Sequence, residues 1–188
     1  MSTHEILIAG FGGQGVLTAG QILAYAGNAE GKQVSWVPAY GPEQRGGTAN
    51  CSVVLSDRPV ACPLVTEPNG CIVMNLPSLE KFEAAVQPGG ILVVNTSLCD
   101  RPTTRTDVVV IPIAATEIAV ELGSVKFANM VALGALLGAL PLVEIETVLK
   151  AMIKVMGKDK ERFVPVNRQA LIKGMDVSRA VVEAQVAL

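Results

Sequence analysis

Short apolar runs and helical periodicity alternate along the first two thirds of this chain. The segments 6–9, 71–75 and 91–95 are apolar except for a final asparagine in the last two, a pattern typical of strands that are buried on both faces of a sheet. Apolar positions spaced by three or four residues begin at Val16 and predict a helix over residues 16–30. Alternation of this kind favours an α/β domain with a parallel sheet.

The rest of the pattern adds strands and a helical C-terminal third. Strands are expected over residues 33–37, 49–56 and 108–112, and a turn at 57–59 with a return strand at 60–62 predicts a β-hairpin. Helices are expected over residues 78–86, 115–122, 128–140, 144–156 and 166–173, with Ser78 as an N-cap and Gly123, Gly157 and Gly174 as C-caps. We therefore expect a single three-layer α/β/α domain whose mixed, mostly parallel sheet contains a hairpin.

No repeat or linker interrupts residues 1–174, which we expect to form one domain. Residues 175–188 would be a C-terminal tail, either a short interface helix with an apolar stripe or a frayed terminus. The nearly uncharged run 127–143 contains a pair of small residues, Gly134 and Gly138, as membrane helices do. Because this run is at the short limit for a membrane span, a buried helix packed closely on the sheet is the favoured interpretation.

Composition excludes several classes of function. Half of the 188 residues (50%) are hydrophobic, only 17% are charged and the net charge is −2, which argues against disorder and against a basic surface for nucleic acid or anionic lipid. A single histidine, His4, excludes most hydrolytic triads and any multi-histidine metal site in this chain. The four cysteines are scattered, with no C-x-x-C, so we expect no iron–sulfur cluster or zinc ribbon here. Free cysteines and the absence of a signal-peptide pattern indicate a cytoplasmic protein without a membrane partner.

A glycine-rich turn follows the first strand. Gly10, Gly12 and Gly15 satisfy G-x-G-x-x-G between a strand and a helix, a Rossmann-like arrangement whose helix N-terminus offers N–H groups to an anion. Gly13 and Gln14 complete the turn. The acidic residue that a dinucleotide site requires at the end of the second strand is absent, which argues against NAD or FAD. Docking of a phosphate, a carboxylate or a partner backbone, and a purely structural tight turn, remain the alternatives.

A second loop, residues 38–50, follows the second expected strand and carries candidate binding residues. Arg45 lies beside two glycines that would let a phosphate or another backbone approach its guanidinium, and Glu43 is a candidate partner for it. The turns after the first two strands should lie at one edge of the sheet, so that both glycine-rich loops form one surface. Candidate site residues of this loop are Tyr40, Glu43, Arg45, Gly46, Gly47, Thr48 and Asn50. Asn129, which opens a later apolar helix, is either in its N-cap or first turn or points at a ligand.

These two loops make the sequence resemble a known family. The stretches 8–16 and 38–52 are similar to the gamma subunit of 2-oxoacid:ferredoxin oxidoreductases, and the likeness continues through 56–60, 74–82, 88–90 and 129–130. It covers roughly residues 5–174. Arg-Gly-Gly-Thr-Ala-Asn at 45–50 looks like the 2-oxoglutarate or branched-chain 2-oxoacid (2-ketoisovalerate) type, whereas the pyruvate type usually reads Arg-Gly-Ala-Pro.

The resemblance implies a subunit of an enzyme complex that converts a 2-oxoacid, coenzyme A and oxidised ferredoxin into acyl-CoA, carbon dioxide and reduced ferredoxin. In the family, thiamine diphosphate and iron–sulfur clusters are held by other subunits: alpha, beta and a ferredoxin-like delta subunit. This chain would hold none of these cofactors alone and would serve assembly, closure of the active-site region and contact with coenzyme A. A stand-alone nucleotide-binding α/β enzyme and a pure scaffold subunit are the competing hypotheses.

Overall fold

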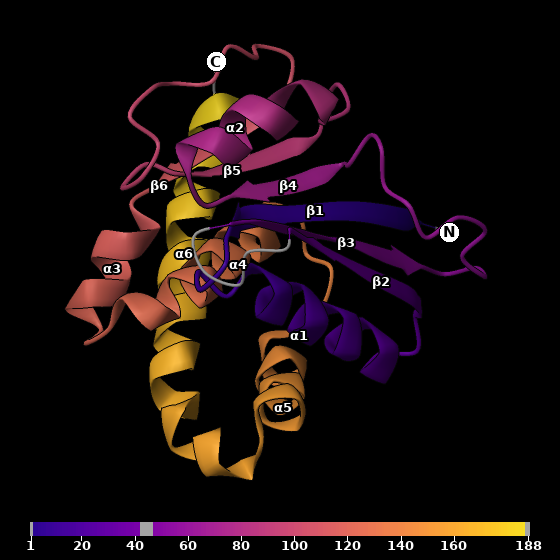
Figure 1. Cartoon of the computed structure of the whole chain (residues 1–188), viewed down its shortest axis with the longest axis vertical. Coiled ribbons are helices and arrows are strands. Elements are labelled where there is room, and N and C mark those ends of the chain that lie inside the picture. Colours follow the sequence, from indigo (N-terminus) through magenta and orange to yellow (C-terminus); the bar gives the residue numbers. More distant parts are fainter. Residues whose placement is uncertain (1, 42–46, 187–188) are drawn as a thin grey trace.

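A six-stranded mixed sheet lies at the centre of the computed structural model, which describes residues 2–41 and 47–186 (Figure 1). The strands, in the spatial order β2-β3-β1-β4-β5-β6, are β1 (Thr3–Phe11), β2 (Gln33–Tyr40), β3 (Thr48–Ser56), β4 (Gly70–Val73), β5 (Ile91–Asn95) and β6 (Val109–Ile113). Strands β1, β4, β5 and β6 pair in parallel, whereas β3 lies antiparallel between β1 and β2. The mixed, mostly parallel sheet predicted from the sequence is confirmed.

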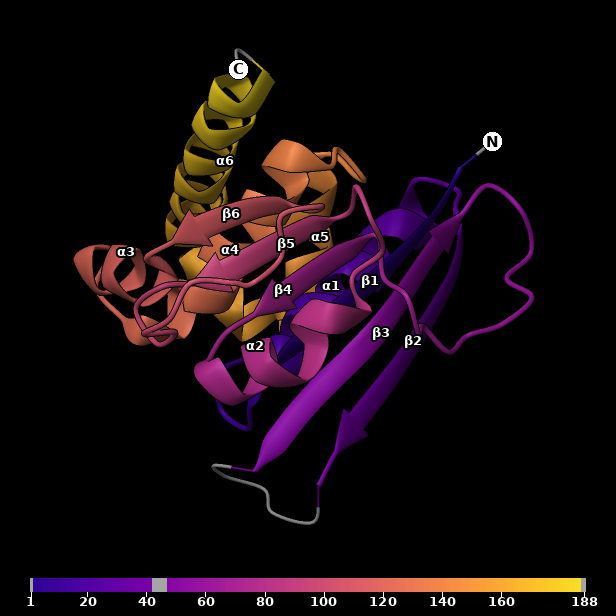
Figure 2. The same ribbon diagram turned by 90° about the horizontal axis from the view of Figure 1, so that it is seen from above.

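Helices cover both faces of this sheet. They are α1 (Val16–Ala29), α2 (Leu76–Phe82), α3 (Ala115–Glu121), α4 (Ala128–Ala139), α5 (Ile145–Met156) and α6 (Val164–Val186), with 3₁₀ turns η1 (Glu83–Ala85), η2 (Val125–Phe127) and η3 (Lys158–Phe163). Helices α1 and α4 lie on one face, with α5 packed on α1 and α6 on α4, while α2 lies on the opposite face (Figures 1 and 2). This arrangement is the expected three-layer α/β/α domain.

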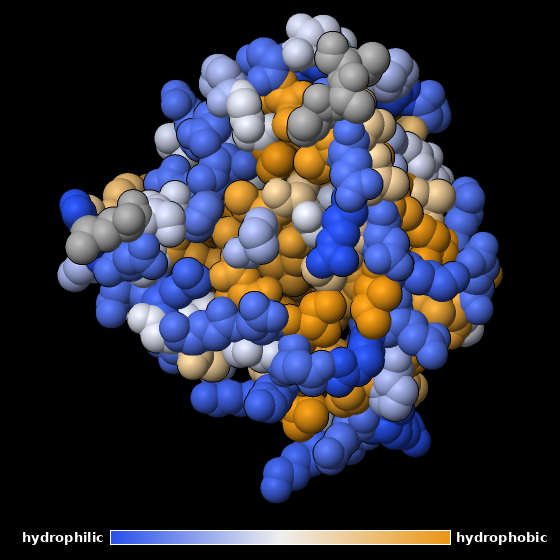
Figure 3. All heavy atoms as spheres, turned by 180° about the vertical axis from the view of Figure 1, so that it is seen from behind, coloured by the Kyte–Doolittle hydropathy of each residue, from blue (hydrophilic) through white to orange (hydrophobic). Residues whose placement is uncertain are grey.

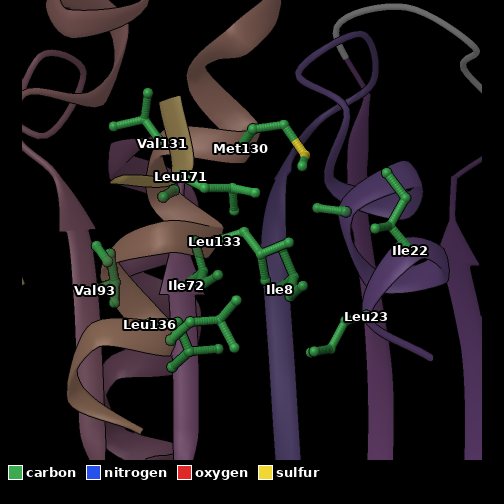
Figure 4. Close-up of a cluster of buried hydrophobic side chains, with 14 of the residues drawn as sticks. Ile8, Ile22, Leu23, Ile72, Val93, Met130, Val131, Leu133, Leu136 and Leu171 are labelled. Carbon is green, nitrogen blue, oxygen red and sulfur yellow. The ribbon is translucent and has the colours of Figure 1, made fainter. Parts of the chain in front are cut away.

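Helix α4 is buried between the sheet and α6, which explains its apolar sequence. Figure 4 shows Ile8 and Ile72 on their strands beside Leu133 and Leu136 of α4, with Leu171 of α6 close by. Each of these five side chains is at most 2% exposed, and full burial of one such side chain contributes about 1.5–3 kcal/mol. In the described part of the chain, no helix has the length and apolar character needed to cross a membrane.

Glycines set the close approach of α4 and α6. A Cβ added to Gly138 would lie 2.8 Å from the Met175 carbonyl oxygen, and one added to Gly134 would overlap backbone atoms of Leu171. Gly174 lies inside α6 and faces the α4 backbone in the same way, so its prediction as a C-cap is wrong. The close contact with α4 outweighs the weak local tendency of glycine to end a helix. Gly157, by contrast, caps α5 with φ 94°, as predicted.

The hairpin is formed by a different pair of strands from the pair predicted. Strands β2 and β3 are antiparallel partners, from Gln33 opposite Ser56 to Tyr40 opposite Ala49. Residues 60–62 form no strand. Prolines at 59 and 63 remove backbone donors around that segment, and both edges of β3 are already paired.

Helix α2 begins earlier than predicted. The Asn75 side-chain oxygen accepts a hydrogen bond from the Ser78 N–H at 3.0 Å, so Asn75 and not Ser78 is the N-cap. Pro77 lies in the first turn of α2. Backbone N–H groups in a first turn have no acceptor within the helix, so proline costs no hydrogen bond there.

Candidate functional site

The two glycine-rich loops meet at one edge of the sheet. Strands β1 and β2 run in the same direction because each is antiparallel to β3, so the segments that follow them emerge on the same side. The Gly12 N–H donates to the Gly47 carbonyl oxygen at 2.9 Å, and the Gly41 N–H donates to the Thr48 carbonyl oxygen at 3.2 Å. For the parts of the two loops that the structure describes, the prediction of a shared surface is confirmed.

The glycine loop requires glycine at particular positions. Gly13 and Gly15 adopt φ values of 99° and 74°, in the left-handed region that L-residues avoid. Gly10 ends the buried part of β1, and a Cβ there would lie 2.6 Å from the Gln14 side-chain oxygen and 3.0 Å from Met74. Gly15 is the N-cap of α1, and it has no side chain that could accept a hydrogen bond from the first helical turn. The N–H groups of that turn are therefore not capped by a side chain and face the loop surface.

A network of amide side chains fastens the loop to the carboxyl ends of β4 and β5. The Gln14 Oε1 accepts hydrogen bonds from the Phe11 N–H at 2.6 Å and from the Asn75 Nδ2 at 2.9 Å. The Asn95 Nδ2 donates to the Met74 carbonyl oxygen at 3.1 Å, and the Gln14 Nε2 lies 3.4 Å from the same oxygen. Asn75 and Asn95 were missed as site residues in the sequence, although Asn95 is the last residue of β5 and Asn75 lies two residues after the end of β4.

Asn129 binds the glycine loop from the opposite side. It lies in the first turn of α4, is 8% exposed, and its Nδ2 donates to the Gly15 carbonyl oxygen at 3.1 Å. The N-cap position of α4 is Phe127. The first-turn position is therefore confirmed, and the Asn129 amide holds Gly15 in place. Contact of Asn129 with a ligand stays a prediction.

Two adjoining cavities open around this loop. The first has a volume of about 520 Å³ and lies between the glycine loop with the start of α1 and the facing residues Tyr40 and Gly47–Ala49. The second, of about 380 Å³, lies between the loop, Thr116 and the η2–α4 segment, and it includes Gln14 and Asn129. Both cavities are lined by Gly13, Gly15 and Thr18, and no described lining residue of either is acidic.

The predicted site residues differ in where the structure places them. Gly12, Gly13, Gly15, Tyr40, Gly47 and Thr48 line the first cavity, Gln14 and Asn129 line the second, and Gly10 supports the turn from below. Asn50 pairs with Ala9 and Ala39 in the sheet. Because neighbouring strand residues point to opposite faces, its side chain lies on the face away from that of the cavity-lining Ala49. Glu43, Arg45 and Gly46 lie outside the described residues.

The titratable groups of the described chain do not form a catalytic cluster at this edge. Burial raises the pKa of the Cys51 and Cys71 thiols to about 12, so both are inert at neutral pH. Within residues 2–41 and 47–186, no three His, Cys, Asp or Glu side chains lie where they would hold a metal ion. The arrangement offers backbone donors, amides and space, which suits binding better than bond-making chemistry.

Glycine-rich loops at the carboxyl edge of a doubly covered sheet define a ligand-binding or subunit-docking α/β domain. Residues 5–177 match the pyruvate ferredoxin/flavodoxin oxidoreductase family, and the chain belongs to this family. The family predicted from the two loops is confirmed.

Similar proteins include single subunits and parts of longer chains. The chain is 39% identical to ketoisovalerate oxidoreductase subunit VorA of Methanothermobacter marburgensis over 96% of its own length but only 38% of the relative's. It is 33% identical to 2-oxoglutarate synthase subunit KorC of Methanocaldococcus jannaschii, covering 93% of this chain and 94% of that one. Thus the chain spans about two fifths of VorA but nearly all of KorC.

Solved structures show the same fold. The gamma subunit of a keto/oxoacid ferredoxin oxidoreductase from Geobacter sulfurreducens matches with a TM-score of 0.83 and 30% identity, covering 96% of this chain and 99% of that one. The 2-oxoglutarate:ferredoxin oxidoreductase of Magnetococcus marinus, solved with 2-oxoglutarate, coenzyme A and succinyl-CoA bound, matches with a TM-score of 0.85 and 27% identity. There the match covers 96% of this chain and 32% of that one.

Proposed function

We propose that this chain is the gamma subunit of a 2-oxoacid:ferredoxin oxidoreductase complex of the 2-oxoglutarate or 2-ketoisovalerate type. The complex would convert a 2-oxoacid, coenzyme A and oxidised ferredoxin into acyl-CoA, carbon dioxide and reduced ferredoxin. Alpha, beta and delta partner subunits would carry thiamine diphosphate and iron–sulfur clusters. The observation that carries the proposal is the joined pair of glycine-rich loops, closed by the hydrogen bond from Gly12 to Gly47.

The role of this chain would be to close the active-site region and to contact coenzyme A. The first cavity suits a phosphorylated ligand because it combines the N–H groups at the start of α1 with a lining free of described acidic residues. Gly13 and Gly15 would let ligand oxygens approach the backbone closely, and Thr18 offers a hydroxyl. Coenzyme A supplies the thiol that becomes the acyl thioester, while these residues bind and orient it.

An apolar surface supports assembly with other subunits. Figure 3, seen from the side opposite to Figure 1, shows apolar side chains gathered in the middle of this face and hydrophilic side chains around them. Large exposed apolar patches mark protein interfaces more often than free surface. The C-terminal residues of α6 remain a candidate part of such an interface, although Val177 and Val181 already pack against the core of the domain.

Reconstitution tests the subunit role. Purified alone, the chain should be colourless and should not reduce a viologen dye with 2-oxoacid and coenzyme A. With its partner subunits it should elute as one larger species and restore turnover. Turnover by the chain alone, or full turnover of the complex without the chain, would contradict the proposal.

Arg45 tests the contribution of the second loop. In the reconstituted complex, Arg45→Ala should raise the Michaelis constant for coenzyme A about ten- to hundredfold with assembly intact, because a charge-assisted contact is lost. Arg45→Lys should recover only part of the affinity for coenzyme A, because lysine keeps the charge but lacks the planar guanidinium. Substitution of the exposed Lys150 on α5, Lys150→Ala, serves as a control. Weakened assembly instead would make the loop an interface. Unchanged assembly and kinetics would leave it a scaffold element.

A further inference from the structure

A third cavity, of about 400 Å³, lies between the start of α4 and the η3 turn. Lys126, Lys160 and Arg162 line it together with two phenylalanines. It shares Lys126, Asn129 and Met156 with the second cavity, but it contains no residue of the two glycine-rich loops. Its volume falls within the range of about 300–1,000 Å³ that small-molecule sites occupy.

The cavity concentrates positive charge on a chain whose net charge is −2. All three of its charged lining residues are cationic, and none of its described lining residues is acidic. Among the described residues, Asp159 forms an ion pair with one of these cations: its carboxylate lies 3.1 Å from the Lys160 ammonium and is 72% exposed. Exposed pairs of this kind are weak, so a multivalent anion can replace Asp159 as the partner of Lys160.

The remaining lining suits a flat apolar group. The rings of Phe127 and Phe163 lie with centroids 6.3 Å apart at a tilt of 54°, and Arg162 lies over Phe163, with its guanidinium carbon 4.9 Å from the ring centroid. Asn129 and Asn167 border the cavity, and each uses one side-chain N–H for a backbone carbonyl, at 3.1 and 2.8 Å. An amide carries a second N–H and an oxygen, the groups that hydrogen-bond to the edge of a nucleobase.

We propose that this cavity binds a phosphorylated nucleoside, with the phosphates among Lys126, Lys160 and Arg162 and the base against the phenylalanine wall. Cations alone would suit any anion, and apolar walls alone would suit any lipophilic molecule. The combination, bordered by buried amides, selects a ligand that has both parts. The proposal rests on this cavity and can fail while the subunit role stands, because assembly and turnover are measured separately.

Calorimetric titration of the full chain with ADP, pyrophosphate and adenosine tests the proposal. ADP should bind at least tenfold more tightly than either pyrophosphate or adenosine, since each of these lacks one of the two recognised parts. Arg162→Ala and Lys160→Ala should each weaken ADP binding about tenfold. Lys158→Ala removes a cation from the same turn that does not line the cavity, and should change the dissociation constant by less than twofold.

A further titration separates two sources of the ligand. Coenzyme A should not displace ADP, because its phosphates are assigned to the first cavity. Competition by coenzyme A would make the third cavity part of the coenzyme A site and would overturn the proposal of a separate nucleotide. Absence of ADP binding by the chain and by the reconstituted complex would overturn it. Equal weakening by Lys158→Ala would also overturn it, because binding would then be unspecific. Loss of subunit association in the Arg162→Ala variant without any ADP binding would reassign the cavity to a protein interface.

Discussion

Replacement of Gly15 by alanine should destabilise the domain through two separable effects. Gly15 has φ 74°, and an L-residue in the left-handed region costs about 1–2 kcal/mol. The added Cβ would also lie 2.6 Å from the Asn129 Nδ2 and 3.0 Å from its Cγ. Overpacking against a buried group costs about 1–3 kcal/mol, so the free energy of unfolding should fall by about 2–5 kcal/mol.

A double-mutant cycle separates the clash from the strain. Asn129→Ala alone removes one hydrogen bond to the Gly15 carbonyl oxygen, which still accepts from the Ala19 N–H at 2.9 Å, so its cost should be about 1 kcal/mol. In the Asn129→Ala background, Gly15→Ala should cost only the strain. The two substitutions should therefore couple by about 1–3 kcal/mol, well above the deviation of about 0.5 kcal/mol expected for independent sites.

Gly13 provides the matched control. Its φ is 99°, but a Cβ there would meet no atom within 4 Å, so Gly13→Ala carries strain without a clash. It should show no coupling to Asn129→Ala. Urea unfolding followed by the fluorescence of Trp36, the single tryptophan, measures all these variants. Additive effects of Gly15→Ala and Asn129→Ala, or equal coupling at Gly13, would refute the contact between α4 and the glycine loop.

Three further predictions concern the packing and the titratable groups. Gly134→Ala should lower the free energy of unfolding by more than about 2 kcal/mol, because the added Cβ would meet backbone atoms of α6. Gly27→Ala should lower it less, because the added Cβ would meet only the end of the Leu55 side chain. Chemical denaturation compares the two variants. Iodoacetamide should alkylate the exposed Cys62 in the native chain, but Cys51 only after unfolding, because burial raises the pKa of the Cys51 thiol to about 12. Mass spectrometry of the alkylated peptides measures both reactions. Burial lowers the pKa of His4 below 6.5 in the folded chain, so the unfolded chain binds its proton more readily and stability should fall as the pH drops below about 6.5. His4→Gln should reduce that loss, and the imidazole signal in NMR should titrate below pH 6.5; an unshifted titration would contradict this.

Local patterns were sufficient to predict the fold class and the glycine loop. Short apolar runs marked the buried parallel strands, and the spacing of Gly10, Gly12 and Gly15 marked a tight turn before α1. The pairing of β3 was predicted incorrectly because alternation shows that a segment is a strand but not which strand lies beside it. The position of Gly174 inside α6 and the amide network around Met74 depend on contacts between distant segments, which no local pattern contains.

One helix joins these distant contacts to the candidate site. Helix α4 is held rigidly at its middle, where glycines bring its backbone against α6, and its first turn carries Asn129 to the Gly15 carbonyl oxygen. The same turn contributes Asn129 to both the second and the third cavity. The apolar segment 127–143 shares its small residues and low charge with membrane helices, but in this fold it is the element that fixes the glycine loop relative to the core.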